Sequence, residues 1–133
     1  PGGGTADGRG GRVNVDLFIL NINSEKPREL FEFYRDVVGL PPHTDPSRES
    51  TLMAGGAELV FDSHSQVGGL APQPARMLAN FFVQNLSTEE ARITSANVRC
   101  IRSQGREFWG GVISTFEDPD GNYFQLIEYK PES

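Results

Sequence analysis

The order of predicted elements along this sequence occurs twice, and this repetition limits the folds that the chain can adopt. Each half reads as one strand, one amphipathic helix and then two or three strands. The halves span about 13–63 and 76–130, and a polar stretch with glycine and proline separates them. Such a duplication predicts an α+β fold, built from two similar modules in a single domain over 13–131.

The first half begins with residues 12–22, where Val, Leu, Ile and Phe predict a buried strand. A helix is predicted next, because apolar residues recur at three- and four-residue spacing over 30–38. Asn23 or Ser24 is expected to cap its start, and Gly39 suits a left-handed C-cap at its end. Two strands then follow, over 50–53 and 57–62.

The second half repeats this order from a strand predicted over 77–84. Ser87 and Glu90 have the spacing of a capping box, which predicts the start of the second helix. Apolar residues continue at helical spacing as far as Ile101, so we expect this helix to end at Gly105. Three strands complete the half, over 106–109, 112–116 and 123–129.

Charge and composition exclude several classes of protein. The net charge of −6 argues against a nucleic-acid partner, because phosphate binding needs clustered Lys and Arg. No apolar run approaches the roughly 20 residues that cross a bilayer. Residues 1–12 are rich in glycine and read as a flexible leader or a remnant of expression. We therefore expect a cytoplasmic protein, with its one cysteine, Cys100, as a small buried side chain on a helix.

Two stretches of the sequence resemble one known superfamily. FEFYRDVVGL over 31–40 resembles the first-helix signature of the vicinal oxygen chelate superfamily, and FEDPDGNYFQLIEY over 116–129 resembles its last turn and strand. This superfamily includes glyoxalases, bleomycin resistance proteins and extradiol dioxygenases. The resemblance implies two βαβββ modules whose curled mixed sheets surround a cavity, commonly completed by dimerisation. Because one fold serves many functions, the site residues must decide between them.

The resemblance also implies where a metal ion would bind in metal-using relatives, namely on the first and last strand of each module. The matching positions in this chain are Leu17 or Ile19, Glu58, Leu78 and Gln125. Glu58 is a good donor and Gln125 a weak, neutral one, and hydrocarbon side chains cannot bind a metal. A register shift of one residue would let Asp16 contribute. His43 and His64 lie in predicted loops and match no ligand position. We therefore predict a cavity without a metal or other cofactor.

Strand alternation predicts which side chains face the cavity. If Gln125 points inward, Phe124 and Leu126 pack beneath a helix. The side chains expected on the cavity face are Glu58, Val60, Leu78, Asn80, Phe82, Tyr123, Gln125 and Ile127. Trp109 lies at a loop edge where the resemblance implies an aromatic residue near the ligand. The candidate ligand-binding residues are Asn80, Phe82, Trp109, Tyr123 and Gln125, and the candidate general base is Glu58.

Structural roles compete with these assignments. Phe82, Val60 and Ile127 are equally well explained as core residues. For Trp109, a partly buried packing role is favoured over a stacking surface for the ligand. Glu58 is also explained as one half of a salt bridge at a dimer seam, or as an idle, half-exposed acid.

Three functions follow from these alternatives. The leading hypothesis is a homodimeric protein that binds and sequesters a small organic compound without a metal. The second is a lyase, isomerase or dioxygenase, either metal-assisted or with Glu58 as general base. The third is a dimerisation or regulatory module whose cavity is filled by its own side chains.

Overall fold

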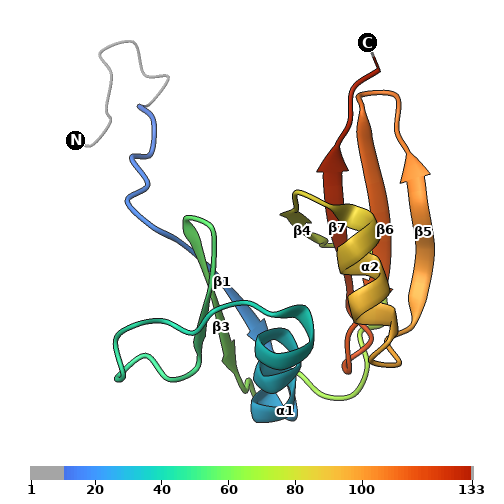
Figure 1. Cartoon of the computed structure of the whole chain (residues 1–133). Coiled ribbons are helices and arrows are strands. Elements are labelled where there is room, and N and C mark those ends of the chain that lie inside the picture. Colours follow the sequence, from blue (N-terminus) through green and yellow to red (C-terminus); the bar gives the residue numbers. More distant parts are fainter. Residues whose placement is uncertain (1–10, 133) are drawn as a thin grey trace.

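The computed structural model describes residues 11–132, so most of the glycine-rich segment over 1–12 lies outside the described residues. Two modules follow one another along the chain (Figure 1). The first contains β1 (Phe18–Asn23), α1 (Pro27–Glu32), the π-helical turn η1 (Phe33–Val38), β2 (Thr51–Ala54) and β3 (Ala57–Asp62). The second contains β4 (Ala79–Phe82), α2 (Leu86–Thr94), β5 (Cys100–Arg106), β6 (Gly111–Glu117) and β7 (Tyr123–Tyr129).

Each module forms its own mixed sheet. The first sheet has the order β1-β3-β2, and the second has the order β4-β7-β6-β5. In both, the first strand of the module runs parallel to the last strand, and the other pairs are antiparallel. Figure 1 shows α1 beside the first sheet and α2 across the second. The predicted α+β fold with two similar modules is therefore confirmed.

The first module has three strands where the resemblance implied four. Residues 41–43 run beside β2, where His43 N donates to Thr51 O and Met53 N donates to Pro41 O. Only an isolated bridge between Pro42 and Leu52 forms there. Because proline has no backbone N–H to donate, this segment cannot complete a regular ladder.

Gly39 ends the first helix as predicted, with a φ of 98°. The start of the helix differs from the prediction, because the N-cap residue is Lys26 and Pro27 begins the helix. Ser24 lies two residues before the N-cap residue, and its buried hydroxyl accepts a hydrogen bond from Lys26 N at 2.9 Å. The serine therefore shapes the turn before the helix instead of capping it.

The second helix is shorter than predicted, and its cap is a different residue. Asn85 is the N-cap and accepts from Thr88 N at 3.1 Å, whereas Ser87 is hydrogen-bonded to Gln104. The helix ends at Thr94, and the chain reverses at Asn97 with a φ of 63°.

Cys100, Ile101 and Gly105 therefore belong to strand β5, and not to a helix and its cap. Apolar spacing over so few residues fits either element, and pairing with β6 decides in favour of the strand. Cys100 is a half-buried free thiol, and burial raises its pKa.

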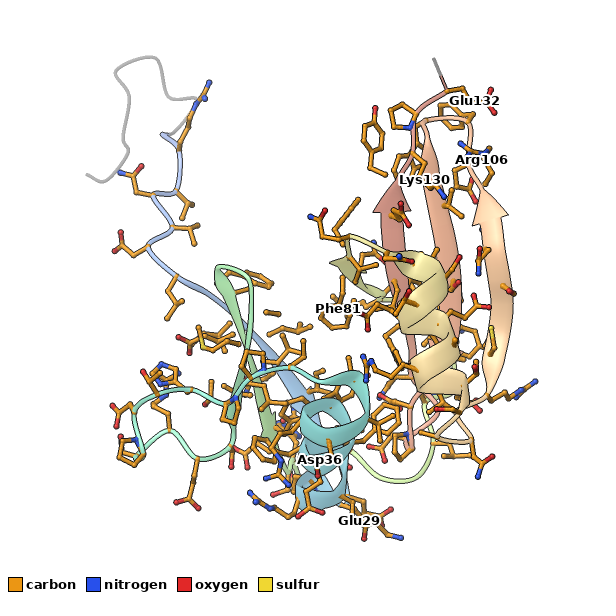
Figure 2. All side chains as sticks on the ribbon, viewed as in Figure 1. Glu29, Asp36, Phe81, Arg106, Lys130 and Glu132 are labelled. Carbon is orange, nitrogen blue, oxygen red and sulfur yellow. The ribbon has the colours of Figure 1, made fainter. Side chains whose placement is uncertain are left out.

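The core joins the two modules through aromatic rings. Tyr34 from η1 packs against Phe61 of β3 and Phe124 of β7, with ring centroids 5.4 and 5.5 Å apart. Phe124 and Leu126 are both buried in this core, as strand alternation predicted. The side-chain view in Figure 2 shows how densely the side chains fill the space around α1.

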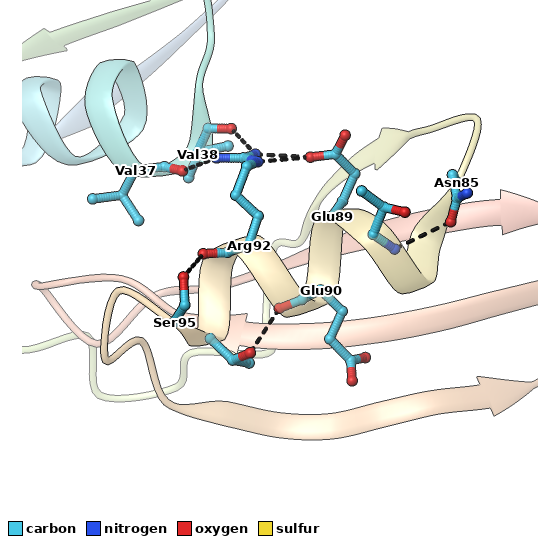
Figure 3. Close-up of polar contacts among 9 residues, drawn as sticks. Val37, Val38, Asn85, Glu89, Glu90, Arg92 and Ser95 are labelled. Carbon is cyan, nitrogen blue, oxygen red and sulfur yellow. Dashed lines mark hydrogen bonds and ion pairs between the residues drawn. The ribbon is translucent and has the colours of Figure 1, made fainter.

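Polar contacts also cross between the modules. Tyr34 Oη donates to Asp118 Oδ2 at 2.7 Å, and both groups are buried. Arg92 of α2 donates to the carbonyl oxygens of Val37 and Val38, at the end of η1 (Figure 3). The guanidinium thereby satisfies carbonyl groups that a helix end leaves without partners.

Within residues 11–132, no helix has the length and apolar character needed to cross a membrane.

Candidate functional site

The candidate site lies on the face of the second sheet that is turned away from α2. Ser114 and Leu126 face the helix side, where the Ser114 hydroxyl bonds Glu90 of α2 and Leu126 joins the core. Alternation therefore places the odd-numbered residues of β6 and β7 on the opposite face. The register sets Asn80 beside Gln125, and Phe82 beside Ile127.

A row of hydrogen-bonded polar side chains, hereafter the polar row, crosses this face from β6 to β4. Thr115 Oγ1 donates to Gln125 Oε1 at 2.8 Å. Gln125 Nε2 donates in turn to Asn80 Oδ1 at 2.8 Å. Thr115 is buried, Gln125 is half-buried and Asn80 is exposed. The row therefore runs from the middle of the sheet to its open edge.

Three exposed aromatic side chains, hereafter the aromatic group, lie toward one end of the same face: Phe82, Trp109 and Tyr129. The Trp109 and Tyr129 rings are stacked, with centroids 6.5 Å apart and an interplanar angle of 12°. Gly111 makes room for them, because a Cβ there would overlap the Trp109 ring. Phe82 is 64% exposed and lies on the neighbouring strand. The structure thus brings Asn80, Phe82, Trp109 and Gln125 onto one face.

Tyr123 lies apart from the aromatic group, at the other end of the sheet. Its backbone N donates to Pro74 O at 3.4 Å. Its side chain lines an open, shallow pocket with residues 73–76. Alternation along β7 puts Tyr123 on the same face as Gln125, at the other end of the sheet from Trp109.

Glu58 lies on the first sheet, and the structure surrounds it with two basic side chains. In the strand register its neighbours are Ile19 and Met53, and its own side chain is buried. Arg48 Nη2 is ion-paired to Glu58 Oε1, and His43 Nε2 lies 3.5 Å from Glu58 Oε2. Both partners come from the loop between η1 and β2, so no strand or helix periodicity could have predicted them.

His43 is held by a second contact. Its Nδ1 accepts a hydrogen bond from Asp45 N at 2.9 Å, which leaves the proton on Nε2, the nitrogen that faces Glu58. Neither ring nitrogen therefore has a free lone pair with which to take a proton from a substrate.

The residues at the positions where the resemblance implies metal ligands do not fit a metal ion. Ile19 and Leu78 are hydrocarbons, and the exposed Asp16 lies before β1. The Glu58 carboxylate is neutralised by Arg48, and the Gln125 carbonyl oxygen accepts from Thr115. Across residues 11–132, no three His, Cys, Asp or Glu side chains gather closely enough to hold a metal.

Comparison with known proteins gives one family and a set of similar folds. Residues 17–126 match the model of the family described as the Glyoxalase/Bleomycin resistance protein/Dioxygenase superfamily. No curated protein matches the chain.

Among solved structures, a glyoxalase/bleomycin resistance protein/dioxygenase family enzyme from Burkholderia phytofirmans superposes with a TM-score of 0.69 at 19% identity. The match covers 86% of this chain and 99% of that one. An integron cassette protein from V. cholerae gives a TM-score of 0.67 at 15% identity, with coverage of 90% and 98%. A superfamily member from Sphaerobacter thermophilus gives 0.65 at 19% identity, with coverage of 86% and 98%. At these identities the likeness concerns the fold alone.

Proposed function

Because this chain belongs to the glyoxalase/bleomycin resistance protein/dioxygenase superfamily, we propose that it binds a small organic compound without a metal ion and without changing it. The observation that carries this proposal is the engagement of the two donors that remain at the metal positions. Glu58 is paired with Arg48, and Gln125 accepts from Thr115. A metal would have to break both contacts and would gain only two protein ligands, too few for tight or selective binding.

The aromatic group supports a ligand with a flat face. Phe82, Trp109 and Tyr129 all expose ring surface on the side of the sheet that carries the polar row. Such rings bind planar compounds through stacking and buried area. A mostly apolar surface with a few fixed polar groups is the usual composition of a small-molecule site.

We propose that a second copy of the chain completes the site. Among residues 11–132, strands β1 and β4 lie at the edges of their sheets, and each has one side without a paired strand. Large apolar side chains are exposed on β1 and just before β1 and β4: Val13, Val15, Leu17, Phe18, Ile19, Met77 and Leu78. Exposed apolar surface along a sheet edge marks interaction sites, and a homodimer would remove it from water.

The alternative function is an enzyme that uses Glu58 as a general base. The Arg48 guanidinium occupies one oxygen of this carboxylate, and His43 lies against the other. A substrate proton would have to compete with both contacts, so the geometry favours binding over base catalysis. A base-only enzyme would lose turnover on Glu58→Gln while keeping its affinity for substrate.

The decisive test is metal content of the purified protein, followed by thermal unfolding in the presence of Zn²⁺, Ni²⁺, Mn²⁺ and Fe²⁺. A metal that binds only the folded state raises the unfolding temperature by mass action. We expect no bound metal and no saturable shift. A stoichiometric metal, or a saturable rise in unfolding temperature, would contradict metal-independent binding and direct attention to metal-assisted lyase, isomerase or dioxygenase chemistry.

A further inference from the structure

The Thr115 hydroxyl determines which groups of the polar row donate hydrogen bonds and which accept them. This side chain is buried in the middle of the second sheet, and a buried hydroxyl proton that finds no acceptor is costly. Among the described residues, its hydrogen-bond partner is Gln125 Oε1 at 2.8 Å. The carbonyl oxygen of Gln125 must therefore face β6, because the reverse orientation would leave the hydroxyl proton without an acceptor.

The orientation of the Gln125 amide in turn determines the orientation of the Asn80 amide at the edge of the sheet. With its oxygen toward Thr115, Gln125 presents its NH₂ group to β4 and donates to Asn80 Oδ1 at 2.8 Å. The oxygen of Asn80 is thus engaged, and its own NH₂ group is left at the exposed edge. Within residues 11–132, no side chain or carbonyl accepts from Asn80 Nδ2. The row consequently ends in an amide that offers two N–H donors.

The surface beside this amide is flat and apolar. Phe82 lies two residues along β4, so it shares a face with Asn80. Ile127 lies next to Phe82 in the register, and Tyr129 follows two residues further along β7 with Trp109 stacked on it. A planar ligand that covers Phe82 would bring its edge toward the Asn80 amide.

From this arrangement we infer that the ligand is a planar, neutral compound that presents a carbonyl oxygen to Asn80. The inference rests on the proposed function and names the class of compound that the site takes. A compound that only donates hydrogen bonds would have to share the oxygens of Asn80 and Gln125 with donors that they already accept, and it would leave the Asn80 N–H groups without a ligand acceptor. A carboxylate would also be an acceptor, but the net charge of −6 disfavours an anion.

Two probes of similar size test this inference. 2-Acetonaphthone is a planar aromatic ketone, and 2-isopropenylnaphthalene replaces its carbonyl oxygen with a CH₂ group. Trp109 is the one tryptophan of the chain, so its fluorescence reports binding at the aromatic group. Free N-acetyltryptophanamide, titrated in parallel, corrects for light absorbed by the probe. We expect the ketone to bind about tenfold more tightly than the hydrocarbon, which corresponds to one net hydrogen bond.

Two variants test whether the N–H groups of Asn80 cause the preference for the ketone. Asn80→Asp keeps an oxygen for Gln125 and removes the N–H donors, so ketone binding should weaken about tenfold while hydrocarbon binding stays unchanged. Thr115→Val removes the hydroxyl that fixes the row, so Gln125 can reverse its amide and the preference for the ketone should shrink.

Failure of the inference and failure of the proposed function give different binding results. Equal affinity of the native chain for both probes, or an undiminished ketone preference in Asn80→Asp, would overturn the inference and leave small-molecule binding standing. The absence of a saturable fluorescence change with either probe would overturn both the inference and the proposed function at this face.

Discussion

At the scale of single residues, the contact between Tyr34 and Asp118 shows how buried polar groups position the site. The turn that contains Asp118 leads directly into β7, the strand that carries Gln125. Asp118 Oδ1 accepts from the backbone N–H groups of Asp120 and Asn122, both at 2.9 Å, while Oδ2 accepts from Tyr34. Burial raises the pKa of Asp118, although its hydrogen bonds from Tyr34 and Asn122 oppose that rise. Burial, and then the charge of Asp118, hold the pKa of Tyr34 well above its ordinary value.

Tyr34→Phe tests this contact. Because the folded-state pKa of Asp118 is raised, the stability that this carboxyl contributes is present below its unfolded pKa and is lost as pH rises through the folded pKa. The tyrosine hydroxyl donates a hydrogen bond that favours the charged form of Asp118. Its removal should therefore lower the free energy of unfolding more at higher pH. We expect a destabilisation of about 1–3 kcal/mol at neutral pH and less in acid, measured by urea unfolding. A pH-independent loss would mean that the hydroxyl does not stabilise the carboxylate.

At the scale of elements, the caps decide where the helices of the two modules begin and end. Two serine positions, Ser24 and Ser87, carry sequence patterns typical of helix caps, yet the structure gives both of them other partners. Short polar side chains in consecutive positions compete for the same backbone N–H groups. The backbone geometry of Asn85, which is extended just before α2, decides that competition.

Asn85→Ala and Ser87→Ala form a matched pair that tests this assignment. Loss of the Asn85 cap should cost about 1 kcal/mol of folding free energy, because Thr88 N loses its acceptor. Ser87 makes only a long, exposed hydrogen bond of 3.3 Å, so its replacement should change stability much less. Chemical unfolding of the two variants supplies the comparison, and equal losses would contradict the observed cap.

At the scale of the whole molecule, strand β1 exposes apolar side chains at the edge of its sheet, and no other part of the described chain covers them. Phe18 is 58% exposed on this edge strand and is one of the exposed apolar side chains that we assign to a homodimer. Phe18→Asp should shift the protein from dimer to monomer, because a buried unpaired charge is costly. Val67→Asp, in the segment between the modules, serves as a control for the added charge.

Sedimentation equilibrium measures both variants. We also expect the dimer of the native chain to strengthen with salt, because two copies of net charge −6 repel each other. A native chain that remains monomeric at high protein concentration would contradict the dimer.

The sequence by itself determined the two-module order, the Gly39 helix end and the side of β7 that each residue faces. These features depend on local spacing and on turn chemistry, which short stretches of sequence carry. Helix α2 was predicted too long, because the apolar spacing through Ile101 fits a helix and a strand equally well. Only pairing with β6 separates the two.

The tertiary structure alone decided the partners of the candidate site. Arg48 and His43 reach Glu58 because an irregular loop folds back over β3, and no periodicity describes such a loop. The orientation of Gln125 depends on Thr115, a neighbour in space from another strand. Sequence spacing fixes which face a side chain takes, whereas its hydrogen-bond partners depend on which strands and loops the folded chain brings beside it.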